Sequence, residues 1–199
     1  MNKVALISLY FGKFPANFGL WLKSAAHNAD IDFLLYGDCD VSAYLPLPPN
    51  VKCFSYTFEQ MKAKIQSKFD FTIELSRPYK LCDYKPIYGY LFEEDLAGYD
   101  YWGHIDLDTI LGDLRAYFPK EAYEKVYQFG HLTMYRNTPE NNRRFMADVG
   151  QDYRKSFSVA DKISACLPFC LPLLPQMADK TDLFSVGFGG QVRPTEFFS

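Results

Sequence analysis

The order of strand and helix patterns in the first seventy residues constrains the fold of this chain more than any other feature. Residues 4–10 form a continuous apolar run, which is typical of a strand buried on both faces of a mostly parallel sheet. Four apolar residues then recur at the spacing of one helix face, namely Phe18, Trp21, Leu22 and Ala25. Residues 31–36 have strand character again, so the chain is expected to begin with a strand, a helix and a strand.

A further strand and helix follow a proline-rich loop at residues 42–50. Residues 51–56 have strand character, and Thr57 and Gln60 have the spacing of a capping box at the start of a helix. Such alternation predicts an α/β protein with a mostly parallel central sheet between two layers of helices. At 199 residues we expect one domain, with a core at residues 1–150 and an irregular segment at residues 151–199.

The elements after residue 80 are predicted from shorter patterns. We expect a helix from about Asp83 to Asp95, a helical turn at residues 114–118 and one strand at residues 126–135. Thr138 is predicted to cap a helix that begins at Pro139 and ends at residue 150.

Composition argues against several classes of function. The net charge of −3 and the isoelectric point near 5.6 argue against a nucleic-acid-binding protein, which would carry a basic stripe. The five cysteines are odd in number and mostly far apart, which indicates a reduced intracellular chain. Cys166 and Cys170 are not followed by a histidine, so we do not expect a zinc site there.

Neither apolar segment of the chain has the pattern of a secretory signal or of a membrane span. The run near the N-terminus lacks a small-residue cleavage site. Residues 163–174 are apolar but short, and Pro168 and Pro172 interrupt them. We therefore expect a cytoplasmic protein, and residues 163–174 leave open a peripheral contact at the inner face of the membrane.

Two carboxylates, Asp106 and Asp108, follow an apolar and aromatic run at residues 99–105. Residues two apart on a strand point to the same side, so both carboxylates can converge on one cation while Leu107 turns into the core. Hard divalent cations prefer oxygen ligands and share them with phosphate oxygens. The pattern predicts a metal and diphosphate site. Because ligands of open α/β sheets bind at the carboxyl ends of strands, residues 8–13 and 38–40 are expected in the same cleft.

Several segments together resemble one family of enzymes. The segments that carry the resemblance are residues 9–12 (Leu-Tyr-Phe-Gly), 77–86, 102–108 (Trp-Gly-His-Ile-Asp-Leu-Asp), 130–137 and 140–144. As a set they resemble nucleotide-sugar glycosyltransferases of the GT-A fold, and more narrowly a bacterial group associated with surface-polysaccharide synthesis. The resemblance covers about residues 3–146 and implies a GT-A-like, Rossmann-like architecture.

The resemblance implies roles for the residues that would hold the phosphates. Asp106 and Asp108 would hold Mn²⁺ or Mg²⁺ against the diphosphate of a nucleotide-sugar donor, with a UDP-sugar as the expected donor. Asp83 would face the nucleotide sugar from a helix start, and Lys80 and Lys85 would approach phosphate there. A helix N-terminus independently favours anions. The alternative for the two lysines is that they are solvated flanks of the helix.

The resemblance also implies a nucleotide pocket at the first two strand ends. Tyr10 and Phe11 would line this pocket, and Asp38 and Asp40 would contact the ribose or the base. The alternative for the two aspartates is turn chemistry after a strand. No catalytic residue is assigned. His131 is a candidate that could face the acceptor pocket, and a packed or hydrogen-bonded histidine is the alternative.

The region after about residue 150 does not match this family. GT-A enzymes usually take a further metal ligand or acceptor-side residues from that region. Three explanations stay open. The metal is held by Asp106, Asp108, water and phosphate alone, or a carboxylate such as Asp179 or Asp182 contributes, or the chain is shortened or diverged.

Three functions are therefore compared. The first, implied by the resemblance, is transfer of a sugar from a nucleotide-diphosphate donor to a glycan or lipid-linked acceptor in polysaccharide biosynthesis. The second is a non-catalytic protein that binds a nucleotide sugar or a glycan. The third and most distant is a haloacid-dehalogenase-type phosphatase, because Asp-Leu-Asp after an apolar strand also opens that site. In those phosphatases the pair normally follows the first strand, whereas here it follows about the fourth.

Overall fold

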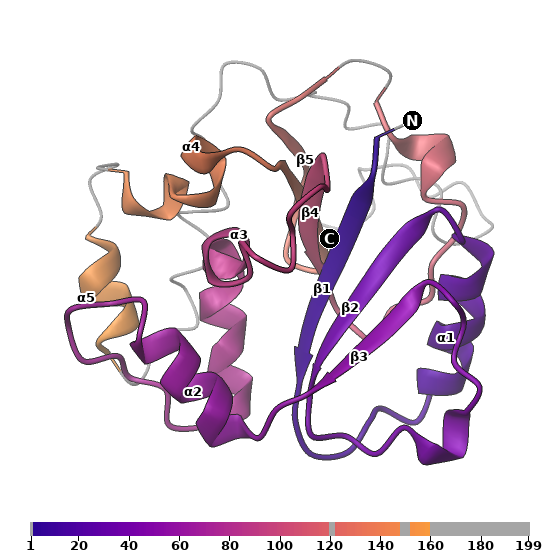
Figure 1. Cartoon of the computed structure of the whole chain (residues 1–199), viewed down its shortest axis with the longest axis horizontal. Helices are drawn as coiled ribbons and strands as arrows, with labels where there is room; N and C mark the ends of the chain where they lie inside the picture. Colours follow the sequence, from indigo (N-terminus) through magenta and orange to yellow (C-terminus); the bar gives the residue numbers. More distant parts are fainter. Residues whose placement is uncertain (1, 120–121, 148–151, 160–199) are drawn as a thin grey trace, which may run out of the picture.

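The computed structural model describes residues 2–119, 122–147 and 152–159, and Figure 1 shows how their elements are arranged. In this part of the chain one six-stranded sheet has the order β3-β2-β1-β4-β6-β5. Its strands are β1 (Val4–Tyr10), β2 (Ile31–Gly37), β3 (Val51–Ser55), β4 (Tyr101–Ile105), β5 (Lys125–Phe129) and β6 (Leu132–Arg136). Neighbours among β3, β2, β1 and β4 are parallel, whereas β6 is antiparallel to both β4 and β5. The structure confirms the α/β class and a mixed, mostly parallel sheet.

The described helices are short, and several of them are 3₁₀ helices. The α-helices are α1 (Phe18–His27), α2 (Phe58–Gln66), α3 (Tyr88–Leu91), α4 (Pro139–Asn142) and α5 (Tyr153–Phe157). The 3₁₀ helices are η1 (Ser42–Tyr44), η2 (Pro78–Ile87), η3 (Arg115–Tyr117) and η4 (Arg144–Met146). The turn expected at residues 114–118 is thus confirmed as η3.

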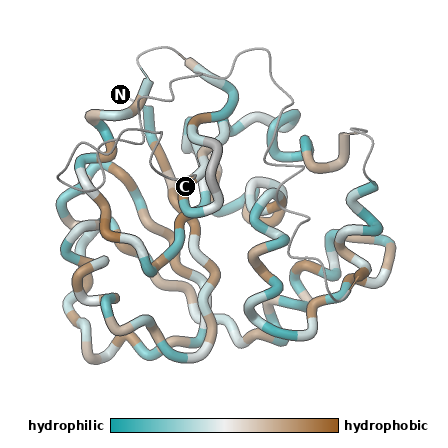
Figure 2. Tube along the Cα trace, turned by 180° about the vertical axis from the view of Figure 1, so that it is seen from behind, coloured by the Kyte–Doolittle hydropathy of each residue, from teal (hydrophilic) through white to brown (hydrophobic). Residues whose placement is uncertain are grey.

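Helices lie on both faces of the sheet, and each face has its own apolar core. Along β1, Val4 and Leu6 contact the core that includes Trp21 of α1. Ala5 and Ile7 point to the opposite face and contact the core beneath α2, η2 and α3. This strict alternation explains why β1 is apolar throughout, and Figure 2 shows apolar residues along the central strands.

The first two helices agree with their sequence patterns. In α1, the predicted face residues Phe18 and Trp21 are fully buried. At the start of α2, the N–H of Gln60 donates to Oγ1 of Thr57 at 3.2 Å, and the N–H of Thr57 donates to Oε1 of Gln60 at 2.8 Å. This reciprocal pair is the predicted capping box, and such a cap contributes about 1 kcal/mol to helix stability.

The helix expected from Asp83 to Asp95 is wrong in its start and in its type. A 3₁₀ helix, η2, begins at Pro78, and α-helical geometry is limited to the four residues of α3. Pro78 suits a first helical position, whereas Pro86 inside the segment cannot donate a backbone hydrogen bond. The prolines therefore favour the tighter 3₁₀ geometry over a regular α-helix, and the helical segment begins at Pro78 instead of Asp83.

The single strand expected at residues 126–135 is also wrong. The chain reverses at Gly130 and His131, so this region forms the hairpin of β5 and β6. Apolar residues flank the reversal on both sides and conceal it in the pattern, although a glycine followed by a polar residue suits a two-residue connection.

The helix after Thr138 begins as predicted but is interrupted. Oγ1 of Thr138 accepts the N–H of Asn141 at 3.2 Å, so the cap is confirmed, and Phe145 is buried. The α-helical geometry ends at Asn142, and η4 follows. The expected helix end at residue 150 lies outside the described residues.

The predictions for the carboxyl-terminal region concern residues outside the described ranges. They concern the apolar segment 163–174, Cys166, Cys170, Asp179 and Asp182. Within the described ranges, no helix has both the length and the apolar character needed to cross a membrane.

Candidate functional site

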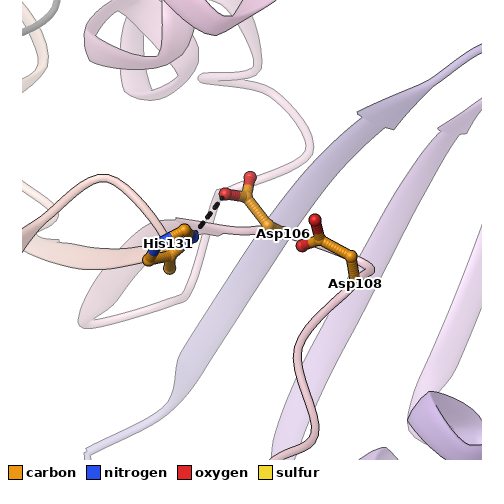
Figure 3. Close-up of side chains that lie close together, drawn as sticks. All are labelled: Asp106, Asp108 and His131. Carbon is orange, nitrogen blue, oxygen red and sulfur yellow. Dashed lines mark hydrogen bonds and ion pairs between the residues drawn. The ribbon is translucent and has the colours of Figure 1, made fainter.

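The candidate site lies where β4 leaves the sheet. Asp106 directly follows β4, and its side chain is 29% exposed, while Asp108 is exposed. Leu107 between them is 2% exposed and belongs to the apolar core on the α1 face. The structure therefore confirms that the two aspartates reach the surface while Leu107 turns inward, and Figure 3 shows both carboxylates at this strand end.

Hydrogen bonds fix the backbone that carries the two aspartates. Oγ of Ser8, a buried residue of the neighbouring strand β1, donates to the carbonyl of Ile105 at 2.5 Å. Oγ1 of Thr109 donates to the carbonyl of Asp106 at 2.7 Å. Because these bonds anchor the chain on both sides of Asp106, its carboxylate is presented on a defined backbone.

The hairpin turn between β5 and β6 brings His131 to Asp106. The backbone N–H of Asp106 donates to the carbonyl of His131 at 3.0 Å, which extends the ladder of β4 and β6 beyond β4. Nδ1 of His131 lies 3.2 Å from Oδ2 of Asp106, as the dashed line in Figure 3 marks. The imidazole is 76% exposed, so it stands at the surface with one nitrogen facing the carboxylate.

Lys85 contacts the other oxygen of Asp106. Its Nζ donates to Oδ1 of Asp106 at 2.5 Å and to the carbonyl of Gly130 at 2.8 Å. The lysine side chain is only 11% exposed, so this ion pair is partly shielded from water. The resemblance implies that Lys85 approaches a phosphate. In the structure, its ammonium is bonded to the predicted metal ligand Asp106 and to the carbonyl of Gly130 in the hairpin turn.

Three side chains could hold one cation. Asp106, Asp108 and His131 each offer a ligand atom, and these atoms lie within 4.8 Å of one another. Two carboxylates and an imidazole suit Mn²⁺ and other first-row divalent metals, and the carboxylates alone suit Mg²⁺. The donor set therefore fits the expected Mn²⁺ or Mg²⁺. The group also leaves coordination positions for ligand oxygens, because three side chains do not complete an octahedral site.

Tyr10 lies close to this group, and Phe11 does not. Burial, with smaller contributions from Cys39 and Asp108, raises the pKa of Tyr10, which places its hydroxyl within the field of Asp108. The Tyr10 ring stacks on Phe14 on the α1 face of the sheet. Phe11 instead meets Phe58 of α2 on the opposite face, edge to face at 5.6 Å.

Asp38 and Asp40 follow β2 and bond to neighbouring loops. Oδ1 of Asp38 accepts the N–H of Gly12 at 2.6 Å, which ties the end of β2 to the end of β1. Asp40 accepts the N–H of Ser42 at 2.8 Å and the Oγ of Ser42 at 2.9 Å. For Asp40 this is the turn chemistry that the sequence offered as an alternative.

Lys80 and Asp83 form an ion pair in the protein interior. Nζ of Lys80 donates to Oδ2 of Asp83 at 2.6 Å, and the two side chains are 3% and 2% exposed. Side chains three apart align in a 3₁₀ helix, so η2 stacks these two on each other. The structure thus brings Lys80 and Asp83 together, and Asp83 is not among the three residues whose ligand atoms gather at the end of β4.

Sequence reasoning missed the position of His131 and the roles of the groups around Asp106. The sequence offers His131 as a residue that could face the acceptor pocket, expects Ser8 in the cleft without a specific role, and gives Thr109 no role. A signal existed for His131, because Gly130 marks a turn between two apolar runs. His104 of β4 is buried in the sheet.

The fold and the site define a class: an α/β protein whose exposed carboxylates and imidazole gather at the carboxyl end of a parallel strand. Residues 6–165 match the sequence profile of a family described as "Family of unknown function (DUF6625)". This match covers most of the chain, and the protein belongs to that family. None of the curated proteins compared with the chain matches it.

Proposed function

We propose that this protein is a metal-dependent glycosyltransferase of GT-A type that uses a nucleotide-diphosphate sugar, with a UDP-sugar as the expected donor. The observation that carries the proposal is the group of Asp106, Asp108 and His131 at the end of β4. In open α/β sheets, ligands bind outside the carboxyl ends of the strands, where this group lies. The resemblance of residues 9–12 and 102–108 to such enzymes adds to the proposal.

The chemistry of the site suits a diphosphate. A divalent cation held by Asp106 and Asp108 would act as a Lewis acid toward the departing nucleoside diphosphate. The chain has a net charge of −3 and the two aspartates add local negative charge, so a diphosphate would need such a cation at this strand end. Asp106 keeps its orientation through Lys85, and Tyr10 offers an aromatic ring near Asp108.

His131 has two proposed roles to choose between. The proposed role is that of a ligand of the cation rather than of the base for the acceptor hydroxyl, because His131 offers a nitrogen within 4.8 Å of the ligand atoms of both Asp106 and Asp108. The proposed acceptor is a glycan or a lipid-linked sugar in polysaccharide biosynthesis. The proposed location is the cytoplasm, and the proposal includes a peripheral contact with the inner face of the membrane.

The first experiment measures ligand-dependent thermal stability. The protein is heated with Mn²⁺, Mg²⁺ or EDTA, each with UDP, GDP, ADP or CDP. We expect one diphosphate to raise the melting temperature when the metal is present and to have little effect with EDTA. Asp108→Asn should abolish this increase. Asp70→Asn is the control, because Asp70 is an exposed aspartate in the loop after α2 and has no assigned role in binding. Stabilisation that does not need a metal would contradict the proposal.

The second experiment separates the three functions. Slow hydrolysis of a UDP-sugar in the presence of Mn²⁺, with loss in Asp108→Asn, is expected for a glycosyltransferase without its acceptor. Metal-dependent binding without any hydrolysis or transfer to an acceptor panel would favour the non-catalytic binding protein. Release of inorganic phosphate from simple phosphomonoesters would favour the phosphatase.

A further inference from the structure

Lys85 connects three segments that are far apart in the sequence. Its backbone lies in η2, and its Nζ reaches Oδ1 of Asp106 after β4 and the carbonyl of Gly130 in the hairpin turn. The side chain is 11% exposed, whereas the imidazole that follows Gly130 is 76% exposed. A shielded ammonium thus holds the base of a turn whose next side chain is at the surface.

The two oxygens of the Asp106 carboxylate have different partners. Oδ1 accepts the ammonium, and Oδ2 is the oxygen that lies 3.2 Å from Nδ1 of His131. A cation bound by this group would therefore contact Oδ2 of Asp106 and the neighbouring Nδ1 of His131, because Oδ1 is bonded to Lys85. Without the ammonium, the carboxylate could rotate and offer both oxygens to the cation.

His131 depends on backbone contacts for its place. An imidazole that is 76% exposed has little packing to restrict its rotation or that of its turn. Two hydrogen bonds hold the turn against β4, one from the N–H of Asp106 to the carbonyl of His131 and one from Lys85 to the carbonyl of Gly130. The second bond is charge-assisted and is the stronger kind.

We propose that Lys85 is a positioning residue that makes His131 a ligand of the cation, by holding the carbonyl of Gly130 and Oδ1 of Asp106 at the same time. This inference rests on the proposed function for the presence of the cation, but not for the nucleotide or the sugar. It also predicts which of the two metals the site prefers. An imidazole nitrogen suits Mn²⁺ better than Mg²⁺, so the clamp made by Lys85 favours Mn²⁺.

The first test is a double-mutant cycle on cation binding without any nucleotide. Mn²⁺ and Mg²⁺ affinities are measured by calorimetry for the wild-type chain, Lys85→Met, His131→Ala and the double variant. A cycle is needed because removal of the ammonium by itself strengthens the attraction of the aspartates for any cation. Lys23→Met is the control, since Lys23 is an exposed lysine of α1 outside the residues assigned to the cleft.

The proposal predicts that the effect of His131 disappears with Lys85. His131→Ala should lower Mn²⁺ affinity about tenfold in the wild-type and Lys23→Met chains, the size expected for loss of an ordered ligand, and less than about twofold in Lys85→Met. His131→Ala should change Mg²⁺ affinity less than Mn²⁺ affinity in each of these backgrounds. Equal losses of Mn²⁺ affinity in the wild-type and Lys85→Met backgrounds would overturn the proposal.

The second test is a spectroscopic signature that a loss of general stability does not imitate. The electron spin resonance of bound Mn²⁺ should show coupling to a directly bound ¹⁴N in the wild-type chain. This coupling should vanish in His131→Ala and Lys85→Met and return in Lys85→Arg, which keeps a cationic donor to both oxygens. Coupling that persists in Lys85→Met, or that is absent from the wild-type chain, would overturn the proposal.

The two proposals can fail separately. If Lys85→Met keeps the nitrogen coupling while the wild-type chain hydrolyses a UDP-sugar, the role of Lys85 is wrong and the glycosyltransferase stands. If the coupling depends on Lys85 but no nucleotide diphosphate binds, the role of Lys85 stands and the function is wrong. If Lys85→Met does not fold, Lys85→Gln replaces it in both tests, because its shorter neutral amide cannot span both oxygens.

Discussion

The chain has an Asp-x-Asp pair after β2 and another after β4, and the two pairs have different surroundings. After β2, Asp38 accepts the N–H of Gly12 and Asp40 accepts both the N–H and the hydroxyl of Ser42. These carboxylates bind neighbouring loops, and they stabilise the turns at this end of the sheet.

The pair after β4 faces other charged and titratable groups instead. Asp106 contacts the ammonium of Lys85 and the imidazole of His131, and Asp108 lies at the surface within the same group of ligand atoms. The difference follows from the position of each strand. Strand β2 lies between parallel neighbours, whereas β4 has the antiparallel β6 beside it, and the hairpin turn before β6 returns to the end of β4. The neighbours of a motif thus decide whether its carboxylates bond to a turn or gather with other possible ligand atoms.

The largest expected effect concerns one glycine in each strand, Gly37 of β2 and Gly103 of β4, where backbone atoms of a neighbouring strand approach closely. A Cβ on Gly37 would lie 1.7 Å from the carbonyl oxygen of Tyr10, and one on Gly103 would lie 2.4 Å from that of Thr133. Each change to alanine should lower the free energy of unfolding by about 3 kcal/mol, because backbone must move to make room. Gly112→Ala is the control, since its Cβ would meet nothing within 4 Å. Chemical denaturation measures the change, and a tolerated alanine at either strand would break the similarity.

The second prediction separates the two pairs by cation binding. Asp106→Asn and Asp108→Asn should each lower Mn²⁺ affinity by at least about tenfold, since each removes a charged ligand. Asp38→Asn and Asp40→Asn should leave it within about twofold, because their carboxylates bond to backbone and hydroxyl groups. Calorimetric titration measures all four. Similar losses for the two pairs would show that the β2 pair also belongs to the cation site.

The third prediction concerns stability without a metal. Asp38→Ala should lower the free energy of unfolding by about 1 kcal/mol, because the N–H of Gly12 loses its partner. Asp108→Ala should not lower it, because an exposed carboxylate near Asp106 gains little from folding. Thermal or urea unfolding in EDTA compares the two. A loss at Asp108 as large as that at Asp38 would show that the β4 pair has a structural role.

The smallest expected effect is a pH dependence at Asp40. The hydrogen bond from the backbone of Ser42, followed by that from its hydroxyl, holds the pKa of Asp40 below its usual value. Because the pKa is lower in the folded state, the turn stabilises the protein above the pKa of the unfolded chain, and this contribution is lost as the pH falls through the folded pKa. Carboxyl NMR titration should show the low pKa in the wild-type chain and a rise in Ser42→Ala. An unchanged pKa in that variant would contradict the assignment.

Much of the sheet could be predicted from sequence because its signals are local. A continuous apolar run defines β1, and the helical spacing of Phe18 and Trp21 defines α1. The period of two in a strand placed Asp106 and Asp108 on the surface with Leu107 between them. These predictions depend on residues a few positions apart, where backbone geometry alone fixes which side chains share a face.

The contacts that complete the site could not be predicted in this way. Lys85 lies 21 residues from Asp106, and His131 lies 25 residues from it, so both contacts depend on tertiary packing. The resemblance assigns Lys85 to a phosphate and does not include its contact with Asp106. The unrecognised turn at Gly130 leaves His131 inside a predicted strand. The missed contacts therefore accompany two errors in element boundaries, which are the weakest part of pattern reasoning.

The reversed direction of β6 has a consequence for how this rim can change during evolution. In a purely parallel sheet, residues at the carboxyl edge come from the loops that lead from each strand into the next crossover helix. The hairpin before β6 is a two-residue connection between paired strands, and it reaches the same edge without entering a helix. Substitutions at Gly130 and His131 can therefore vary the chemistry beside Asp106 while the parallel strands and their covering helices stay intact.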